Sequence, residues 1–216
     1  MVGMIESLAQ ANSIQVTTEL IAEGGMTLSG HLYNVQVLDL IRSGSWDYIV
    51  LQEQSTLPLE NYPAFENSVS RFNKEIVSSG SKTVLFCTWA REHIPEMFKE
   101  LEIAYQSAAK RSSATVVPIG LAWNLVKENR PTIPLYEQDK SHPSQLGSYL
   151  SACVFACHLL GIPSDKIPGR IALFDGVYLD LDGEIMATFR TCLDKTLVAQ
   201  SRVSEGVKSE NLILNG

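Results

Sequence analysis

The chain of 216 residues lacks the features that mark nucleic-acid-binding, membrane and secreted proteins. Its 17 Lys and Arg residues are outnumbered by 24 Asp and Glu residues, which gives a net charge of −7 and no basic stripe for phosphate contacts. No apolar run approaches the ~20 residues of a membrane helix, and Met1 to Gln10 has no secretory signal pattern. We therefore expect neither a nucleic-acid nor a membrane partner. Localisation stays open: cytoplasmic if Met1 is the natural start, secreted or periplasmic if the N-terminus is truncated.

Motifs for metals and organic cofactors are also missing. The four cysteines form no Cys-x-x-Cys pair, so we expect buried core thiols rather than a zinc site or a disulfide framework. Gly24-Gly25 lacks the Gly-x-Gly-x-x-Gly pattern of dinucleotide binding, and no phosphate loop is present. The sequence therefore predicts no cofactor and no metal.

What the sequence does contain is an alternation of strand-like and helix-like segments. This alternation predicts an α/β domain with a mostly parallel sheet, whose ligands bind at the carboxyl ends of the strands. Helical spacing of apolar residues predicts helices at 2–11, 32–41, 63–78, 95–110, 121–129, 142–160 and 183–200. A β-branched run predicts a strand at 14–22, and near-continuous apolar runs predict strands buried on both faces at 46–52, 82–89 and 114–119. We expect a single domain over residues 1–203 and a C-terminal tail at 204–216.

The most informative stretch is Asp139-Lys140-Ser141-His142, which Pro143 and a long apolar helix follow at once. A carboxylate three residues before an imidazole suits a general base and the group that orients it. The Asp accepts from one ring nitrogen and fixes the tautomer, which leaves the other nitrogen free to take a proton from a nucleophile. The alternative is a helix-entry loop in which Asp139 only makes a structural hydrogen bond.

Four motifs, in order along the chain, resemble the SGNH (GDSL-like) hydrolase superfamily, and in particular a poorly characterised bacterial branch of it. They are Gly-Gly-x-x-Leu at 24–28, Trp-Asp-Tyr-Ile-Val-Leu-Gln-Glu-Gln-Ser at 46–55, Pro-x-Gly-x-Ala-Trp at 118–123 and Asp-x-x-His-Pro-Ser-x-x-Gly-x-Tyr-Leu at 139–150. The resemblance implies a three-layer α/β/α domain with a mostly parallel, flavodoxin-like sheet. It also implies a Ser-His-Asp arrangement that hydrolyses esters.

The resemblance assigns a role to most of the candidate site. His142 matches the general base, and Asp139 matches its orienter. The backbone N–H of Gly24 or Gly25 matches an oxyanion donor, and Gly25 is the preferred candidate. The family's Asn donor has no counterpart, so the amide of Gln52 or Gln54 is the candidate in its place. At the end of the next strand, Trp89 and Arg91 are candidates to line the pocket, with Arg91 either facing an anionic substrate or simply solvated. Glu53 is either a carboxylate partner or an exposed acid, and His31 is interpreted as a surface or packing residue rather than a catalytic one.

The nucleophile is where the chain departs from the family pattern. The family carries its serine at the end of the first strand, just before the first helix, and this chain begins inside what resembles that helix. The first strand and the motif serine are therefore expected to be absent, through a longer natural chain or through loss. Ser55 is the best internal candidate, whereas Ser141 adjoins the base in sequence and points elsewhere if His142 faces the pocket. The apolar run 212–214 in the tail is a candidate to fill the vacant strand position, in its own chain or a neighbour's.

Three functions follow from these observations. The first is an SGNH-type ester hydrolase, an acyl or acetyl esterase with carbohydrate as a candidate substrate, which uses a His-Asp base pair that is incomplete in this chain. The second is a non-catalytic small-molecule or carbohydrate-binding domain derived from such a hydrolase. The third is an assembly domain that forms a homodimer by edge pairing. Retention of Asp139 with His142 favours the enzyme, and absence of a Gly-x-Ser turn favours the other two.

Overall fold

The structure is a computed structural model that describes residues 1–173 and 176–210, with residues 201–210 described as backbone only. The chain divides into two compact units. One consists of Met1–Thr18, Leu125–Glu137 and Pro143–Gly216, and the other consists of Glu19–Asn124 and Gln138–His142. The single domain expected over residues 1–203 stays a prediction.

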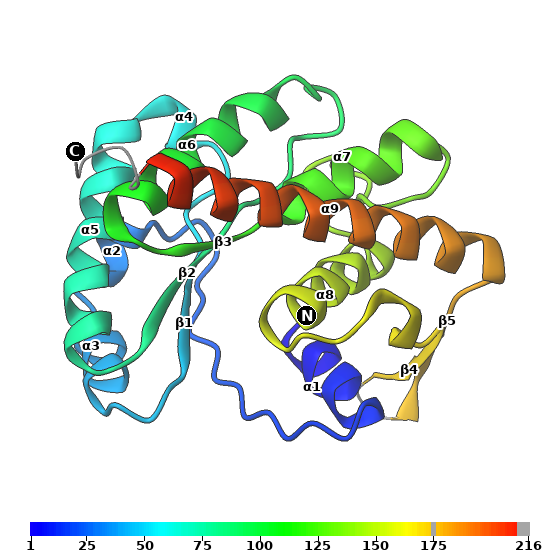
Figure 1. The fold of residues 1–216 in the computed structure, drawn as a ribbon, viewed down its shortest axis with the longest axis horizontal. Coiled ribbons are helices and arrows are strands. Elements are labelled where there is room, and N and C mark those ends of the chain that lie inside the picture. The colour runs from blue at the N-terminus through cyan, green and yellow to red at the C-terminus, as the bar shows by residue number, and fades with distance from the viewer. Residues whose placement is uncertain (174–175, 211–216) are drawn as a thin grey trace. The chain divides into compact units, whose positions relative to one another are not determined.

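The second unit contains a parallel three-stranded sheet (Figure 1). Its strands are β1 (Tyr48–Leu51), β2 (Lys82–Phe86) and β3 (Thr115–Val117), paired in that order. Leu51 lies opposite Leu85, and Phe86 lies opposite Val117, so the three carboxyl ends meet at one edge of the sheet. The α/β class and the parallel sheet are therefore confirmed, and the loops that follow β1 and β2 are neighbours.

Helices cover one face of this sheet. They are α2 (Leu28–His31), α3 (Val35–Arg42), α4 (Leu57–Glu60), α5 (Tyr62–Ser78) and α6 (Met97–Ser112), while α7 (Ile119–Asn129) follows β3. Helix α5 shows how the sequence directs this packing. Asn61 caps its first turn by accepting from Ala64 N, and its apolar residues recur at helical spacing on one buried face, at Phe65, Val69, Phe72 and Ile76. That face packs in one cluster with Leu85 of β2.

The strands differ in burial. Every residue of β2 from Thr83 to Phe86 is buried, as predicted for a strand covered on both faces. In β1 the same prediction is wrong, because Tyr48 and Val50 are 38% and 42% exposed. Strand β1 pairs with β2 alone, so its second edge has no strand partner among the described residues.

The prediction of a strand at 14–22 is also wrong. These residues have no regular structure, and residues 15–22 make no backbone–backbone hydrogen bond with any residue that the structure describes. Their β-branched composition favours a strand, but a strand exists only where a neighbour accepts its hydrogen bonds. None of the described residues pairs with this segment.

The first unit is built on helices. It contains α1 (Val2–Ala11), α8 (Gln145–Leu159), the short helix η1 (Ser164–Lys166) and α9 (Gly183–Glu210), together with an antiparallel hairpin of β4 (Arg170–Ala172) and β5 (Tyr178–Asp180). Helix α8 begins at Gln145 because the Ser144 side chain accepts from Gly147 N. The sequence did not predict the hairpin. Helix α9 extends to Glu210, and the strand proposed for 212–214 lies outside the described residues.

The structure also bears on the expectations for cysteines, metal sites and membrane-spanning helices. All four cysteines are buried and free, as predicted for core thiols. Within residues 1–173 and 176–200, whose side chains the structure describes, no group of three His, Cys, Asp or Glu side chains is arranged to hold a metal ion. No helix in the same part of the chain combines the length and apolarity that crossing a membrane requires.

Candidate active site

Asp139 and His142 are in direct contact, in the sheet-containing unit. Asp139 Oδ1 accepts hydrogen bonds from the backbone N–H groups of Ser141 and His142, both at 2.9 Å. Asp139 Oδ2 accepts from His142 Nδ1. Lys140 lies between them with a φ of 59°, a left-handed conformation that closes the short turn. The carboxylate thus holds Nδ1–H and leaves Nε2 as the free nitrogen of the ring.

The pKa of Asp139 is set by hydrogen bonds rather than by burial. The bond from His142 and the two backbone N–H groups lower the pKa of Asp139 from 3.8 to about 2, so its carboxyl is ionised at neutral pH. The side chains of His142 and Asp139 are 78% and 49% exposed. An open imidazole backed by a fixed negative charge can accept a proton and be stabilised as it does so.

Trp89 anchors the loop that carries the pair. Its Nε1 donates to Ser141 O at 2.9 Å, and Glu92 N donates to Lys140 O at the same distance. The Trp89 indole stacks on Trp123 with 4.2 Å between ring centroids and 7° between planes. Trp89 is a candidate to line the pocket, and the structure shows that its N–H group also holds the loop of the base in place. Its role toward substrate stays a prediction.

The Pro-x-Gly-x-Ala-Trp motif explains how this stack forms. Gly120 N donates to Cys87 O at 2.9 Å, so the start of α7 lies against the end of β2. A Cβ at Gly120 would lie 2.3 Å from Thr88 O, a backbone atom that cannot move aside cheaply. Glycine at this position therefore permits the approach that brings Trp123 under Trp89.

The turn expected to supply an oxyanion donor is open to solvent. Gly25 has a φ of 75°, which favours glycine, and both glycines of the turn are exposed. After the turn, Thr27 caps α2 by accepting from Gly30 N at 3.1 Å. The backbone N–H of Gly25 is on the exposed turn that directly precedes this cap.

The two candidate amide donors differ. Gln52 is exposed directly after β1. Gln54 uses its side-chain oxygen as a cap, accepting from Thr56 N at 2.9 Å, Thr56 Oγ1 at 3.1 Å and Leu57 N at 3.0 Å. Only the amide NH₂ group of Gln54 is left to donate. Arg91, considered for an anionic substrate, is half-buried, and its Nε atom is buried without a hydrogen-bond partner.

Glu53 is a residue whose burial sequence reasoning did not predict. Of its two interpretations, a carboxylate partner or an exposed acid, the exposed one is wrong, because only 2% of the residue is accessible. Its Oε1 accepts from Leu28 N at 3.0 Å and from Gln54 N at 2.8 Å, which joins the glycine turn to the end of β1. Burial raises its pKa, against the opposing effect of both N–H donors and of nearby His31. One feature of the sequence could have indicated this burial. In an extended strand, residues two positions apart lie on the same face, and Glu53 is two residues after the buried Leu51.

No described side chain supplies an obvious nucleophile. Ser55 lies half-buried in the turn before α4, and neither its hydroxyl nor that of any other residue within 1–173 and 176–200 hydrogen-bonds His142 Nε2. Ser141 contributes its backbone to the loop: its N–H donates to Asp139, and its carbonyl oxygen accepts from Trp89. The Cys87 thiol is excluded because burial raises its pKa far above neutrality.

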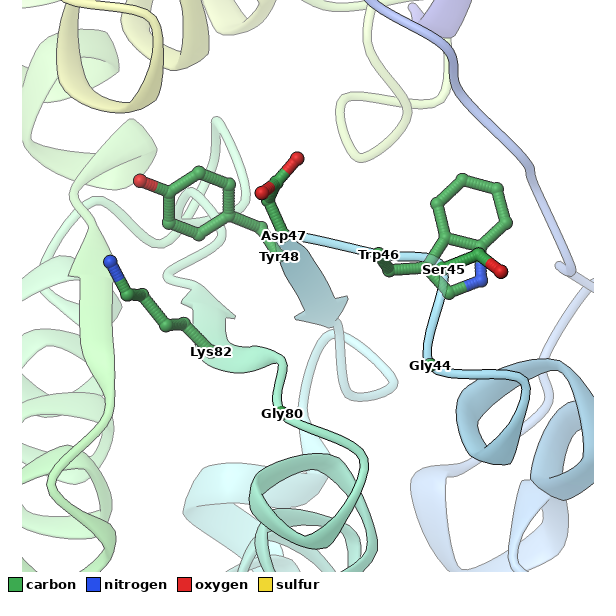
Figure 2. Close-up of a pocket in the computed structure, with 7 residues that line it drawn as sticks. All are labelled: Gly44, Ser45, Trp46, Asp47, Tyr48, Gly80 and Lys82. Carbon is green, nitrogen blue, oxygen red and sulfur yellow. The ribbon is translucent and has the colours of Figure 1, made fainter.

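The pocket in Figure 2 lies at the other end of the sheet. It has a volume of about 380 Å³ and is lined by residues at or before the amino ends of β1 and β2: Gly44, Ser45, Trp46, Asp47, Tyr48, Gly80 and Lys82. Lys82 Nζ lies 5.7 Å from the centre of the Tyr48 ring, and Trp46 Nε1 donates to Leu40 O. Ligands of such sheets bind at the carboxyl ends, so this pocket is separate from the candidate site.

Comparisons with known proteins bear on the fold. No protein-family model matches the chain, and no curated protein sequence matches it. Among solved structures, a DUF4886 family protein from Bacteroides uniformis is similar with a TM-score of 0.74 and 16% identity, over 90% of this chain and 88% of that one. A candidate SGNH hydrolase from Slackia heliotrinireducens has a TM-score of 0.59 and 24% identity, over 71% of this chain and 89% of that one.

An esterase, EstA from a Pseudoalteromonas species, is similar with a TM-score of 0.57 and 12% identity, over 74% of this chain and 85% of that one. At sequence identities this low, the structural similarity shows the fold alone, so the chemistry has to be argued from the site residues. The parallel sheet, the helices that flank it and these neighbours together give the chain an SGNH hydrolase-like α/β fold.

Proposed function

We propose that this chain is an SGNH-type ester-hydrolysing domain in which His142 is the general base and Asp139 orients it. The observation that carries the proposal is the hydrogen bond from His142 Nδ1 to Asp139 Oδ2, which leaves Nε2 free on an exposed ring. A module that only bound ligands would not need a base held in one tautomer by an ionised carboxylate.

The proposed chemistry is acyl transfer from an ester to water. Nε2 of His142 takes the proton of the attacking hydroxyl, and the imidazolium that forms is stabilised by Asp139. The negative charge on the former carbonyl oxygen is met by the N–H of Gly25 and an amide of Gln52 or Gln54. The imidazolium then protonates the leaving alcohol, and water releases the acyl group by the same route. Ser55 is the candidate hydroxyl within the chain.

The exposure of the pair supports a substrate whose ester projects from a larger molecule. The His142 side chain is 78% exposed, so a small acyl group can reach it while the alcohol portion stays in solvent. Acetyl esters of carbohydrates have this form, and we propose them as the first substrates to test.

Hydrolysis of a short-chain aryl acetate tests the proposal. We expect turnover by the wild-type chain that falls by about 10²–10⁴ in His142→Ala, the usual contribution of a general base. His93→Ala is the matched control, because His93 is an exposed histidine in the loop after β2. Loss of turnover in Ser55→Ala would identify the nucleophile. Turnover that is the same in wild type and His142→Ala would exclude the hydrolase proposal.

A second candidate is a carbohydrate-binding or other small-molecule-binding domain that binds its ligand at the same site. The observation in its favour is that no hydroxyl or thiol of residues 1–173 and 176–200 hydrogen-bonds His142 Nε2. Binding of an acetylated sugar that shifts the amide signals of Gly25 and Gln54, without release of acetate, would favour this candidate over the enzyme.

A further inference from the structure

Glu53 is the one charged residue that is buried in the part of the chain described at side-chain level. Its Oε2 atom is buried without a hydrogen-bond partner. Taking a carboxylate out of water is unfavourable, and an apolar side chain of similar volume avoids that cost. A buried carboxylate directly after β1 therefore needs a local explanation.

The hydrogen bonds of Glu53 supply one. A single oxygen, Oε1, accepts from Leu28 N and from Gln54 N, at 3.0 and 2.8 Å. Leu28 is the first residue of α2 and lies 25 positions earlier in the chain, just beyond the glycine turn. Gln54 belongs to the loop after β1. The carboxylate is thus the polar link between two loops that are far apart in sequence.

These two loops hold every proposed oxyanion donor. Gly25 lies three residues before Leu28, and Gln52 and Gln54 flank Glu53. Oxyanion donors stabilise charge only when they are fixed before the reaction, at about 2.7–3.1 Å from the developing oxygen. An exposed turn with glycine at positions 24 and 25 has little rigidity of its own. The link through Glu53 supplies the missing constraint.

Other roles for Glu53 fit less well. A proton-transfer role requires access to substrate, and the residue is 98% buried. A metal ligand requires partners, and no suitable group of three exists within the described residues. A charge partner is not the explanation either. Among the described residues, the only charged side chain that lowers the pKa of Glu53 is His31, and its effect is smaller than that of either backbone N–H donor.

We infer that Glu53 is a positioning residue, which fixes the Gly24–Leu28 turn against the end of β1 and thereby sets the oxyanion donors. The oxyanion part rests on the proposed function, whereas the link between the two loops stands on the hydrogen bonds alone. The carboxylate acts through the backbone of Leu28 and Gln54 and does not touch the substrate.

Amide hydrogen exchange, measured by NMR, tests the link in the full chain. We compare wild type with Glu53→Met, which keeps the volume and removes the acceptor, and Glu53→Gln, which keeps one acceptor oxygen. Glu60→Gln is the matched control, because Glu60 is exposed a few residues further on. We expect exchange at Leu28 and Gln54 to be at least about tenfold faster in Glu53→Met, because both amides lose their acceptor oxygen. Glu53→Gln and Glu60→Gln should stay close to wild type.

Two results would overturn the inference. One is fast exchange at Leu28 and Gln54 in the wild-type protein, which requires no variant to fold. The other is unchanged exchange at both amides in folded Glu53→Met. A shift of the Gly25 amide signal in Glu53→Met, absent from Glu53→Gln, is expected if the turn moves when the link is removed.

Aryl acetate kinetics separate positioning from simple support of the fold. In Glu53→Met we expect kcat to fall by about 10², the usual effect of a lost oxyanion donor, with KM nearly unchanged. Glu53→Gln should recover most of this loss. A kcat that stays at the wild-type value in Glu53→Met would contradict the inference. If the wild type shows no turnover, the proposed function fails, and the exchange result still decides the link.

Discussion

Two carboxylates of the sheet-containing unit, Asp139 and Glu53, each accept two backbone N–H groups on one oxygen. The donors are at 2.9 and 2.9 Å for Asp139, and at 3.0 and 2.8 Å for Glu53. The pKa of Asp139 is lowered to about 2, whereas the pKa of Glu53 is raised. The backbone hydrogen bonds are alike, so they do not account for the opposite directions.

Burial and the second oxygen account for the difference. Asp139 is exposed, and its Oδ2 accepts from His142, so every nearby group favours its charge. Glu53 is buried, and its Oε2 has no partner, so desolvation outweighs the two N–H donors. The comparison separates two uses of one side-chain type. An exposed carboxylate orients a base, whereas a buried one holds two segments together.

The largest effect is expected on turnover, from a substitution of Asp139. Asp139→Asn keeps the shape but removes the charge that stabilises the imidazolium of His142. We expect kcat for an aryl acetate to fall by about 10²–10⁴, with little change in the urea unfolding midpoint. Asp165→Asn, at an exposed acid in η1, serves as control. Equal kcat values for Asp139→Asn and wild type would remove Asp139 from the mechanism.

The next effect is on stability, from the Glu53 side. Glu53→Ala leaves the N–H groups of Leu28 and Gln54 without their acceptor and opens a cavity. We expect a loss of about 2–3 kcal/mol in the free energy of unfolding, measured by urea denaturation. Asp139→Ala should lower the midpoint less, because the hydrogen bonds of Asp139 are exposed to solvent and its removal leaves no buried cavity. A smaller loss for Glu53→Ala than for Asp139→Ala would reverse the comparison.

A smaller effect is expected from Trp89→Phe, which keeps a ring over Trp123 and removes the donor to Ser141 O. We expect a loss of about 1 kcal/mol in stability and a several-fold fall in kcat as the base loop loosens. Trp46→Phe is a close control, since Trp46 Nε1 also donates to a backbone carbonyl, that of Leu40. That variant should lose similar stability without a change in kcat. A parallel fall in both variants would show that Trp89 does not act on the loop.

The smallest effect is the pH dependence of stability, where the two carboxylates have opposite signs. Asp139 has a lowered pKa, so its stabilisation is present above 3.8 and is lost as the pH falls toward about 2. Glu53 has a raised pKa, so the folded state binds more protons than the unfolded state above 4.5, and stability falls as the pH rises from there.

Urea denaturation across this pH range tests both signs. Asp139→Asn should flatten the rise in stability between about pH 2 and pH 4, and Glu53→Gln should flatten the decline above pH 4.5. The second expectation is wrong if Glu53→Gln follows the wild-type profile above pH 4.5.

Much of the fold could be predicted from local patterns. Helix α5 and strand β2 lie close to where the spacing of apolar residues placed them, because each pattern depends on neighbours within a few positions. Residues 14–22 show the limit of this reasoning. Their composition favours a strand, but none of the described residues pairs with them. Strand β1 was located correctly, while its exposure depends on what lies beside it.

The candidate site divides in the same way. The contact between Asp139 and His142 followed from the sequence by itself, because three residues separate them and a single turn brings the carboxylate to the ring. Only the tertiary structure decided that Trp89 meets Ser141, 52 positions later, and that Glu53 is buried against Leu28, 25 positions earlier. Local hydrogen bonds are encoded by spacing, whereas burial of a charge depends on which distant segments the fold brings together.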